Sequence, residues 1–306
     1  MPLHIETPLV ESRALSALTG RSIWLKLDAL QPSGSFKLRG VGAACEHHAR
    51  AGKTRFVSSS GGNAGVAVAY AGRKLSVPAV VVVPETATDL AKGLIRQEDA
   101  EVIVHGASWM EANAHAQSLI DAATAFIHPF DDPLLWGGHA TMIDEVARAG
   151  ETFDAVVLSV GGGGLMAGVV EGLDRNGLSN TPVIAVETEG AASLAKSIEA
   201  GRRIELPAIT SIATSLGAKQ VCQRAFDLTK TRPIQSAIVS DKAALNACEQ
   251  FLADHRILVE PACGAALALA YDGSAALGDH QKILIIVCGG ATASLDQQRQ
   301  WAGALG

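Results

Sequence analysis

The sequence has few aromatic residues, no surplus of basic residues and no long apolar run. Hydrophobic residues make up 48% of the 306 residues but aromatics only 4%, a composition typical of a soluble globular protein rather than a disordered or fibrous one. With a net charge of −6, the chain has no basic excess to neutralise a nucleic-acid backbone. The strongest apolar run, at residues 283–288, is far too short to span a bilayer. We therefore expect a protein that binds neither nucleic acid nor membrane.

The cysteines show no pattern of a metal site or of a disulfide framework. They are an odd number and lie far apart along the chain. The first residues also lack the basic segment and apolar stretch that mark a secreted protein. Because free thiols fit a reducing compartment best, we expect a cytoplasmic protein. The five cysteines are Cys45, Cys222, Cys248, Cys263 and Cys288.

Short apolar runs rich in β-branched residues alternate with glycine-rich turns and longer alanine-rich stretches. Three junctions of this kind lie at residues 56–63, 155–164 and 283–290. The alternation is typical of βα units on a parallel sheet. We predict an α/β fold with two domains, each an open, mostly parallel twisted sheet flanked by helices. The turn-rich residues 129–133 are a suitable place for the chain to cross between the domains.

The four glycines at residues 161–164 are the strongest candidate for an anion site. Ligands of open α/β sheets bind at the carboxyl ends of strands, and residues without Cβ atoms let successive N–H groups converge on a phosphate. A flexible linker is disfavoured because an apolar strand precedes the glycines and an apolar helix follows them. The segment therefore predicts a phosphate-binding loop.

The same segment admits a different ligand. Residues 162–167 match the pattern G-x-G-x-x-A, and Glu187 ends the next strand about 20 residues later, as in a dinucleotide-binding fingerprint. This interpretation would make the protein a nicotinamide-dependent oxidoreductase. A single match of this pattern is a weak signal, so the rest of the chain has to decide.

Lys37 follows a small-residue turn and an aromatic residue, in the segment 33–40. On spacing alone, a solvated lysine near a helix start would explain it better than a functional one. However, the segment resembles the lysine motif of the fold-type II pyridoxal-phosphate enzymes, the tryptophan synthase β-like superfamily. Further motifs in the same order cover nearly the whole chain and resemble the L-serine dehydratase and L-threonine dehydratase branch, which leaves the oxidoreductase a remote alternative. These motifs lie at residues 31–37, 60–65, 129–133, 159–164, 259–266 and 287–290.

The resemblance implies how the chain divides and what it binds. Residues 1–33 and 136–306 would form a large cofactor-binding domain. Residues 34–135 would form a small domain that carries the Schiff-base lysine and the loop for the substrate carboxylate. The implied cofactor is pyridoxal 5′-phosphate, the implied partner is a small amino-acid substrate, and the implied assembly is a homodimer.

The resemblance also implies residue roles. Lys37 would hold the cofactor as a Schiff base and later transfer protons, with Phe36 packed beside the pyridine ring. Asn63 would donate a hydrogen bond to the 3′ oxygen of the cofactor, a role compatible with capping a helix, and Cys288 would face the pyridine nitrogen. The implied cofactor contacts are Phe36, Lys37, Asn63, Gly161, Gly162, Gly163, Gly164, Leu165 and Cys288, and the implied substrate contacts are Ser60, Gly61, Asn63 and Ala64.

A monovalent cation such as K⁺ is implied as a second bound group. Six positions align with those that supply oxygens to such a cation in similar dehydratases, and two of them, Glu187 and Ser193, would use side chains. The six positions are Gly161, Glu187, Ala191, Ser193, Leu216 and Ala218.

The implied reaction is β-elimination, which converts L-serine to pyruvate and ammonia and L-threonine to 2-oxobutyrate. A racemase or a β-replacement enzyme of the same superfamily would share most of the motifs, so both alternatives stay open. Two departures from close relatives stand out. Gly61 replaces an alanine found in some of them and leaves the preferred substrate open, and Gly137-Gly138-His139 follows Trp136 where a charged residue is common.

Overall fold

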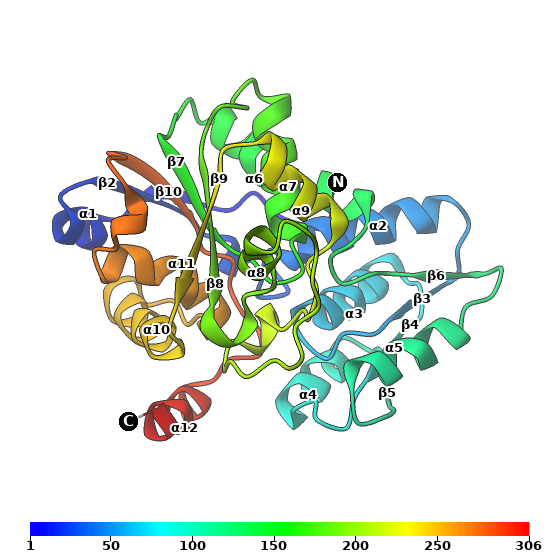
Figure 1. Cartoon of the computed structure of the whole chain (residues 1–306). Coiled ribbons are helices and arrows are strands. Elements are labelled where there is room, and N and C mark those ends of the chain that lie inside the picture. Colours follow the sequence, from blue (N-terminus) through cyan, green and yellow to red (C-terminus); the bar gives the residue numbers. More distant parts are fainter. Residues whose placement is uncertain (306) are drawn as a thin grey trace.

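Two β-sheets organise the part of the chain that the computed structural model describes, residues 1–305. Helices flank each sheet, and the two sheets lie side by side in Figure 1. This arrangement confirms the predicted α/β fold with mostly parallel sheets. Gly306, the last residue of the predicted large domain, lies outside the described residues. Within residues 1–305, no helix is long and apolar enough to cross a membrane.

The larger sheet joins the two ends of the chain. Its strand order is β1-β2-β10-β7-β8-β9, and only the pair β1 and β2 is antiparallel. Strand β10 pairs with β2, so that Ile283 lies beside Ile23. The central strands are rich in Val, Ile and Ala and are buried on both faces, as expected for parallel strands between helices. The strands are β1 (Leu9–Glu11), β2 (Ser22–Lys26), β7 (Ala155–Ser159), β8 (Val183–Thr188), β9 (Ile234–Val239) and β10 (Lys282–Ile286).

The smaller sheet is built from one continuous stretch of chain between β2 and β7. Its order is β5-β4-β3-β6, and every pair is parallel. All five residues of β4 are buried, whereas the edge strand β5 is partly exposed. The strands are β3 (Arg55–Ser58), β4 (Ala79–Val83), β5 (Glu101–Val104) and β6 (Thr124–Phe126).

Helices α2 to α5 belong to the stretch that contains the smaller sheet, and the others surround the larger sheet. The most buried is α11, whose 11 residues are all buried because it packs against β7, β8 and α10. The helices are α1 (Arg13–Thr19), α2 (Lys37–Arg50), α3 (Asn63–Leu75), α4 (Asp89–Gln97), α5 (Trp109–Ser118), α6 (Pro133–Arg148), α7 (Gly164–Arg175), α8 (Ser193–Glu199), α9 (Gln223–Thr231), α10 (Asp241–His255), α11 (Pro261–Tyr271) and α12 (Leu295–Leu305), with short 3₁₀ turns η1 (Asp28–Leu30), η2 (Glu189–Ala191), η3 (Thr214–Leu216) and η4 (Ala275–Leu277).

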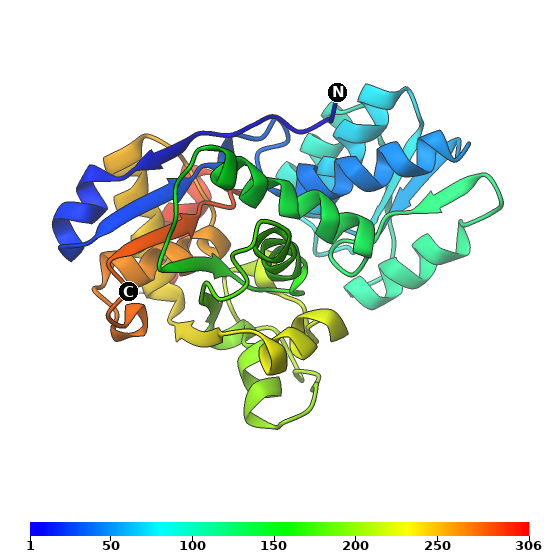
Figure 2. The same cartoon turned by 90° about the horizontal axis from the view of Figure 1, so that it is seen from above.

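The first residues of the chain cross from one sheet to the other. In Figure 2 the N-terminal segment starts near α2 and runs across to β1. Along this path Leu3 N donates to Glu46 Oε1 of α2 at 2.9 Å, and Thr7 N donates to Glu145 Oε2 of α6 at 3.3 Å. The segment therefore links the helices beside the smaller sheet to the larger sheet.

We propose that residues 1–33 and 136–306 form the large domain and residues 34–135 the small one, because each part contains one complete sheet. The proposed domain boundary between residues 135 and 136 falls within α6. This helix packs against α2 and against α7, so it contacts helices of both parts. In this proposal helix α6 connects the two domains.

A buried cluster of charged side chains fixes α2 against the larger sheet. Arg39 of α2 pairs with Asp28 of η1 at 2.7 Å and with Glu145 of α6 at 2.6 Å. Lys26 of β2 pairs with the same glutamate at 2.5 Å. All four side chains are at most 4% exposed, and their two positive and two negative charges cancel. The first turn of α2, where Lys37 lies, is thereby held in place.

Removing one partner from this cluster should destabilise the fold strongly, because it leaves a buried charge without compensation. We expect Arg39→Ala to lower the free energy of unfolding by about 3–5 kcal/mol. The matched control is Arg148→Ala, whose partner Glu6 is 67% exposed, and this change should hardly shift the urea midpoint. Equal midpoints for the two variants would show that the cluster does not stabilise the fold.

Candidate active site

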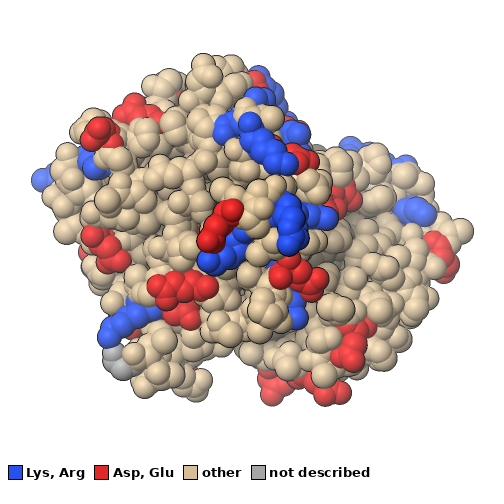
Figure 3. All heavy atoms as spheres, viewed as in Figure 1, with Lys and Arg blue, Asp and Glu red and all other residues tan. Residues whose placement is uncertain are grey.

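A large cavity lies between the two sheets, with a volume of about 870 Å³. Its walls come from the loops that follow the carboxyl ends of parallel strands, including Ser60 after β3, Pro84 after β4, Gly161 after β7 and Cys288 after β10. This is where open α/β sheets bind their ligands, and the volume is that of a cofactor or small-molecule site. On the face shown in Figure 3, acidic and basic side chains are interspersed between the two parts of the molecule.

Lys37 is the first residue of α2, and its amine lies in this cavity. The Nζ atom donates to the carbonyl oxygen of Pro129 at 2.5 Å. Burial lowers the pKa of Lys37 to about 8, although Cys288 and Glu260 act in the opposite direction. A lysine with a lowered pKa is more often neutral, and a neutral amine is a nucleophile and a base. The solvated lysine considered for this position is therefore not what the structure shows.

The turn before Lys37 is bound to the turn after β10. Phe36 N donates to Cys288 O at 3.0 Å, and Gly290 N donates to Gly34 O at 2.9 Å. Gly34 has a φ of +77°, and an added Cβ would lie 2.9 Å from the Cβ of Ala291. The glycine is therefore required by both its backbone conformation and the close approach of the two turns.

The glycine loop passes from β7 into α7 at the opposite wall. Gly163 caps the helix with a φ of +91°, and Cys222 N, at the start of α9, donates to Gly162 O at 2.9 Å. An added Cβ on Gly162 would lie 2.3 Å from the ring of Phe130. The helix begins with N–H groups that have no helical acceptor, and Gly161 to Gly164 place no side chains of their own beside them. The loop therefore fits a phosphate.

The loop 60–62 leads into α3 on the side of the smaller sheet. Gly62 N approaches Ser60 Oγ at 3.4 Å, and both residues line the cavity together with Ala64. The N-terminus of a helix attracts anions, so the loop suits a carboxylate. A Cβ added to Gly61 would lie 3.2 Å from Ala87 and 3.3 Å from Val83, so an alanine would require small shifts.

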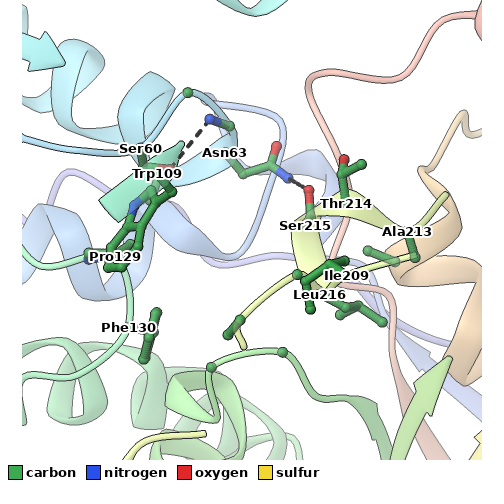
Figure 4. A pocket seen from close by; sticks show the side chains of 18 of the residues that line it. Ser60, Asn63, Trp109, Pro129, Phe130, Ile209, Ala213, Thr214, Ser215 and Leu216 are labelled. Carbon is green, nitrogen blue, oxygen red and sulfur yellow. Dashed lines mark hydrogen bonds between the residues drawn. The ribbon is translucent and has the colours of Figure 1, made fainter. Parts of the chain in front are cut away.

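Asn63 bridges from α3 to the other side of the cavity. Its Nδ2 donates to Glu260 Oε1 at 2.5 Å and to Ser215 Oγ at 3.3 Å, and its Oδ1 accepts from Ala291 N at 2.8 Å. Figure 4 shows the amide directed toward Ser215. The alternative considered for Asn63, a helix cap, is wrong, because Gly62 is the capping residue and Asn63 is the first residue of the helix.

Glu260 is a residue of the site to which the sequence motif at 259–266 assigned no role. It precedes Pro261 at the start of α11 and is buried. Its carboxylate accepts hydrogen bonds from Asn63, Ser215 and Thr292, and its pKa is raised by burial despite these bonds. An acidic residue before an entirely apolar helix is a signal that could have indicated it, since acidic residues are seldom buried without partners.

Cys288 lies on the cavity wall with 6% exposure. A hydrogen bond with Cys263, together with burial, raises the pKa of its thiol well above the usual range. The thiol is therefore neutral, in keeping with a weak hydrogen-bond partner rather than a counter-charge. The cavity wall also includes Phe36, whose ring packs on His139 at a centroid distance of 4.9 Å, and Leu165.

The Gly137-Gly138-His139 segment, which had no explanation in the sequence, is partly explained by packing. A Cβ on Gly138 would lie 2.5 Å from the carbonyl oxygen of Arg39, so the glycine permits the close approach of α6 to α2. His139 is fully buried, and its ring has no hydrogen-bond partner within residues 1–305. Nothing in the surroundings of Gly137 requires a glycine.

The six positions aligned with a cation site lie on adjacent loops. Glu187 is the last residue but one of β8, and its carboxylate accepts from Leu194 N at 2.8 Å and Ala195 N at 2.7 Å, while burial raises its pKa to about 7. Ser193 Oγ is buried without a hydrogen-bond partner among the described residues. The other four positions are Gly161, Leu216 and Ala218 on the cavity wall and Ala191 in η2.

Comparisons with known proteins identify the family. The family described as "Pyridoxal-phosphate dependent enzyme" matches residues 1–289. The chain belongs to this family. The family match gives no support to the nicotinamide-dependent alternative for residues 162–167, and it agrees with a cavity that combines a buried lysine with a phosphate-sized glycine loop.

Named relatives cover nearly the whole chain. An L-serine dehydratase of Dictyostelium discoideum is 44% identical, covering 97% of this chain and 91% of its own. An L-serine dehydratase/L-threonine deaminase of Homo sapiens is 46% identical, and the match covers 100% of this chain and 96% of the human one. The crystal structure of a fungal L-serine ammonia-lyase from Rhizomucor miehei superposes with a TM-score of 0.94 at 33% identity and covers 99% of both chains. These proteins are what the chain is similar to, and they agree with the predicted branch of the family.

The glycine loop offers a test of phosphate binding. Gly162→Val should push the Phe130 ring into the cavity and block close approach of the loop backbone to the phosphate of the cofactor. We expect the dissociation constant of pyridoxal phosphate, from spectroscopic titration of the apoprotein, to rise by about tenfold or more, which is about 1.4 kcal/mol. Circular dichroism should stay that of the folded protein. Unchanged affinity in a folded variant would place the phosphate elsewhere.

Proposed function

We propose that the protein is a pyridoxal-phosphate-dependent L-serine ammonia-lyase, which converts L-serine to pyruvate and ammonia and L-threonine to 2-oxobutyrate and ammonia. The observation that carries the proposal is the buried amine of Lys37, with its pKa lowered to about 8, in one cavity with a glycine loop and the N-terminus of α3. The names of the relatives that cover the whole chain support the same activity.

The residues of the cavity fit the cofactor. Lys37 would join it covalently, the loop from Gly161 to Leu165 would hold its phosphate, and Asn63, Phe36 and Cys288 would contact its ring. Once bound, pyridoxal phosphate supplies an electron sink for the charge that develops at the substrate Cα. The protein supplies orientation, exclusion of water and control of protons.

The substrate carboxylate would bind at the loop that carries Ser60 and Gly61 and at the first amides of α3, including that of Ala64. The positive end of the helix and the hydroxyl of Ser60 both favour an anion there. This places the substrate Cα between α3 and Lys37. A Cβ at Gly61 would meet Ala87 and Val83 rather than open space, so the structure shows no spare room at this position. Acceptance of L-threonine is supported by the name of a relative, an L-serine dehydratase/L-threonine deaminase.

Lys37 would act at the α-proton. Once the substrate amine has taken its place, its Nζ would be a free amine in the cavity. A base with a pKa near the working pH is effective for taking a proton from carbon. The carbonyl oxygen of Pro129, at 2.5 Å, holds the amine in place and can accept one of its protons.

Cys288 supports elimination over racemisation. Its neutral thiol can offer the pyridine nitrogen a weak hydrogen bond but not a negative charge. Without a carboxylate partner this nitrogen would stay largely unprotonated, so negative charge at Cα would be delocalised less fully into the ring. Expulsion of the β-hydroxyl group would then compete well with return of the proton.

We also propose a bound monovalent cation such as K⁺. The carboxylate of Glu187 has only backbone N–H partners, and Ser193 Oγ has none among the described residues. A cation beside them would balance the buried negative charge and use the free oxygen. The homodimer and the cytoplasmic location belong to the proposal as well, and both rest on the family resemblance.

Incubation of the holoenzyme with L-serine and no added nucleophile tests the reaction. We expect equal amounts of pyruvate and ammonia, with 2-oxobutyrate from L-threonine. Lys37→Ala should lower the rate by about 10²–10⁴-fold, whereas Lys53→Ala, which removes an exposed lysine bonded to Ala122 O, should leave it unchanged. D-Serine without pyruvate would show a racemase, and turnover that requires a nucleophile such as sulfide would show a β-replacement enzyme.

A further inference from the structure

Glu260 brings a buried carboxylate into the cavity that contains Lys37. Both carboxylate oxygens have donors, because Asn63 Nδ2 donates to Oε1 at 2.5 Å and Thr292 Oγ1 donates to Oε2 at 3.1 Å. The residue stands at the N-terminal end of α11, where the helix dipole favours a negative charge. A Cβ on Gly290 would lie 2.3 Å from Glu260 Cγ, so the glycine makes room for this side chain. The surroundings are therefore built to hold a carboxylate.

The contacts of Asn63 allow its amide only one orientation. The Oδ1 atom accepts from the backbone N–H of Ala291, and the Nδ2 atom donates to Glu260. Turning the amide over would place an N–H against an N–H on one side and an oxygen against a carboxylate on the other. The second Nδ2 proton is directed at Ser215 Oγ, at 3.3 Å (Figure 4). Glu260 thus takes one Nδ2 proton and fixes the amide with the other on the side of Ser215. This second proton, now in the long contact with Ser215 Oγ, is the one that a cofactor oxygen would take over.

The charge of Glu260 also acts on Lys37. The titratable groups that interact with Lys37 are Glu260, Cys288, His128 and His139. Burial lowers the pKa of both histidines, so they are neutral near pH 7, and the thiol of Cys288 is neutral as well. Among these groups Glu260 is the carboxyl group, and although burial raises its pKa, its three hydrogen bonds and Lys37 itself favour its charged form. A charged Glu260 would oppose loss of a proton from the Lys37 nitrogen.

We propose that Glu260 is a positioning residue with two tasks: it holds the Asn63 amide as a donor toward the cavity, and its charge keeps a proton on the Lys37 nitrogen. The inference rests on the proposed function and deepens it. With the cofactor bound, a positive nitrogen on Lys37 would favour attack by the substrate amine, and the Asn63 donor would serve the 3′ oxygen. Glu260 prepares both groups without touching the substrate.

Two substitutions separate the tasks. Glu260→Gln removes the charge but keeps the shape, since its amide oxygen can accept from Asn63 and its amide nitrogen can donate to Thr292 Oγ1. Glu260→Ala removes both the charge and the acceptor of Asn63. The control is Glu249→Gln, which removes a carboxylate from the exposed face of α10.

The first measurement is the pH titration of the visible absorption of the bound cofactor, which reports the proton on the Lys37 nitrogen. We expect the midpoint to move to lower pH by about 1–3 units in Glu260→Gln, because an opposite charge nearby raises the pKa of a cationic nitrogen. The pH dependence of amine labelling at Lys37 in the apoprotein should shift in the same direction. Glu249→Gln should titrate as the wild type does.

The second measurement is cofactor affinity. Glu260→Gln should bind pyridoxal phosphate within about threefold of the wild type, and Glu260→Ala should bind it at least about tenfold more weakly. An unshifted titration in Glu260→Gln would overturn the charge task, and wild-type affinity in a folded Glu260→Ala would overturn the positioning task. These readouts do not require turnover, so wild-type protein that binds the cofactor at Lys37 but forms no pyruvate would contradict the proposed function alone.

Discussion

The site depends on the contact between the turn before Lys37 and the turn after β10. Two backbone hydrogen bonds join them, from Phe36 N to Cys288 O and from Gly290 N to Gly34 O. Positive φ values at Gly34 and Gly289 let the two turns bend where they meet, and a side chain at either glycine would collide with the opposite turn. The contact fixes the positions of Lys37 and Cys288 relative to each other on the wall of the cavity.

The same contact extends to the groups that hold the substrate loop. The residue after Gly290, Ala291, donates to Asn63, and Thr292 donates to Glu260. Asn63 begins the helix whose N-terminal loop is the proposed carboxylate site. One short segment of the larger sheet therefore places the lysine, the proposed ring contact and the carboxylate loop relative to one another, although these residues come from distant parts of the sequence.

Sequence patterns predicted the fold because its signals are local. The β-branched runs before residues 58 and 161 and the alanine-rich stretches after them correspond to strands and helices, and the lack of polar residues in the strands matches their burial on both faces. The glycine loop was predicted for the same reason, because four adjacent glycines after a strand allow the backbone to approach a ligand closely. The resemblance to a family, confirmed by the match over residues 1–289, supplied what spacing alone did not for Lys37.

What the sequence could not indicate depends on side chains that meet only in the folded chain. Along the sequence Glu260 stands out only as an acidic residue before an apolar helix, and its importance comes from the donors of Asn63, Ser215 and Thr292 around it. The ion cluster likewise joins Arg39 to Glu145, which lies more than a hundred positions later in the sequence. The requirement for glycine at 138 follows from the packing of α6 on α2 and from nothing in its neighbours along the chain.

The central claim is that Lys37, and no other lysine, joins the cofactor. Borohydride reduction of the holoenzyme followed by peptide mapping tests it most directly, because reduction makes the link permanent. The account predicts the pyridoxyl mass on the peptide that contains Lys37. A label on Lys26 or Lys53, or on no lysine, would contradict it.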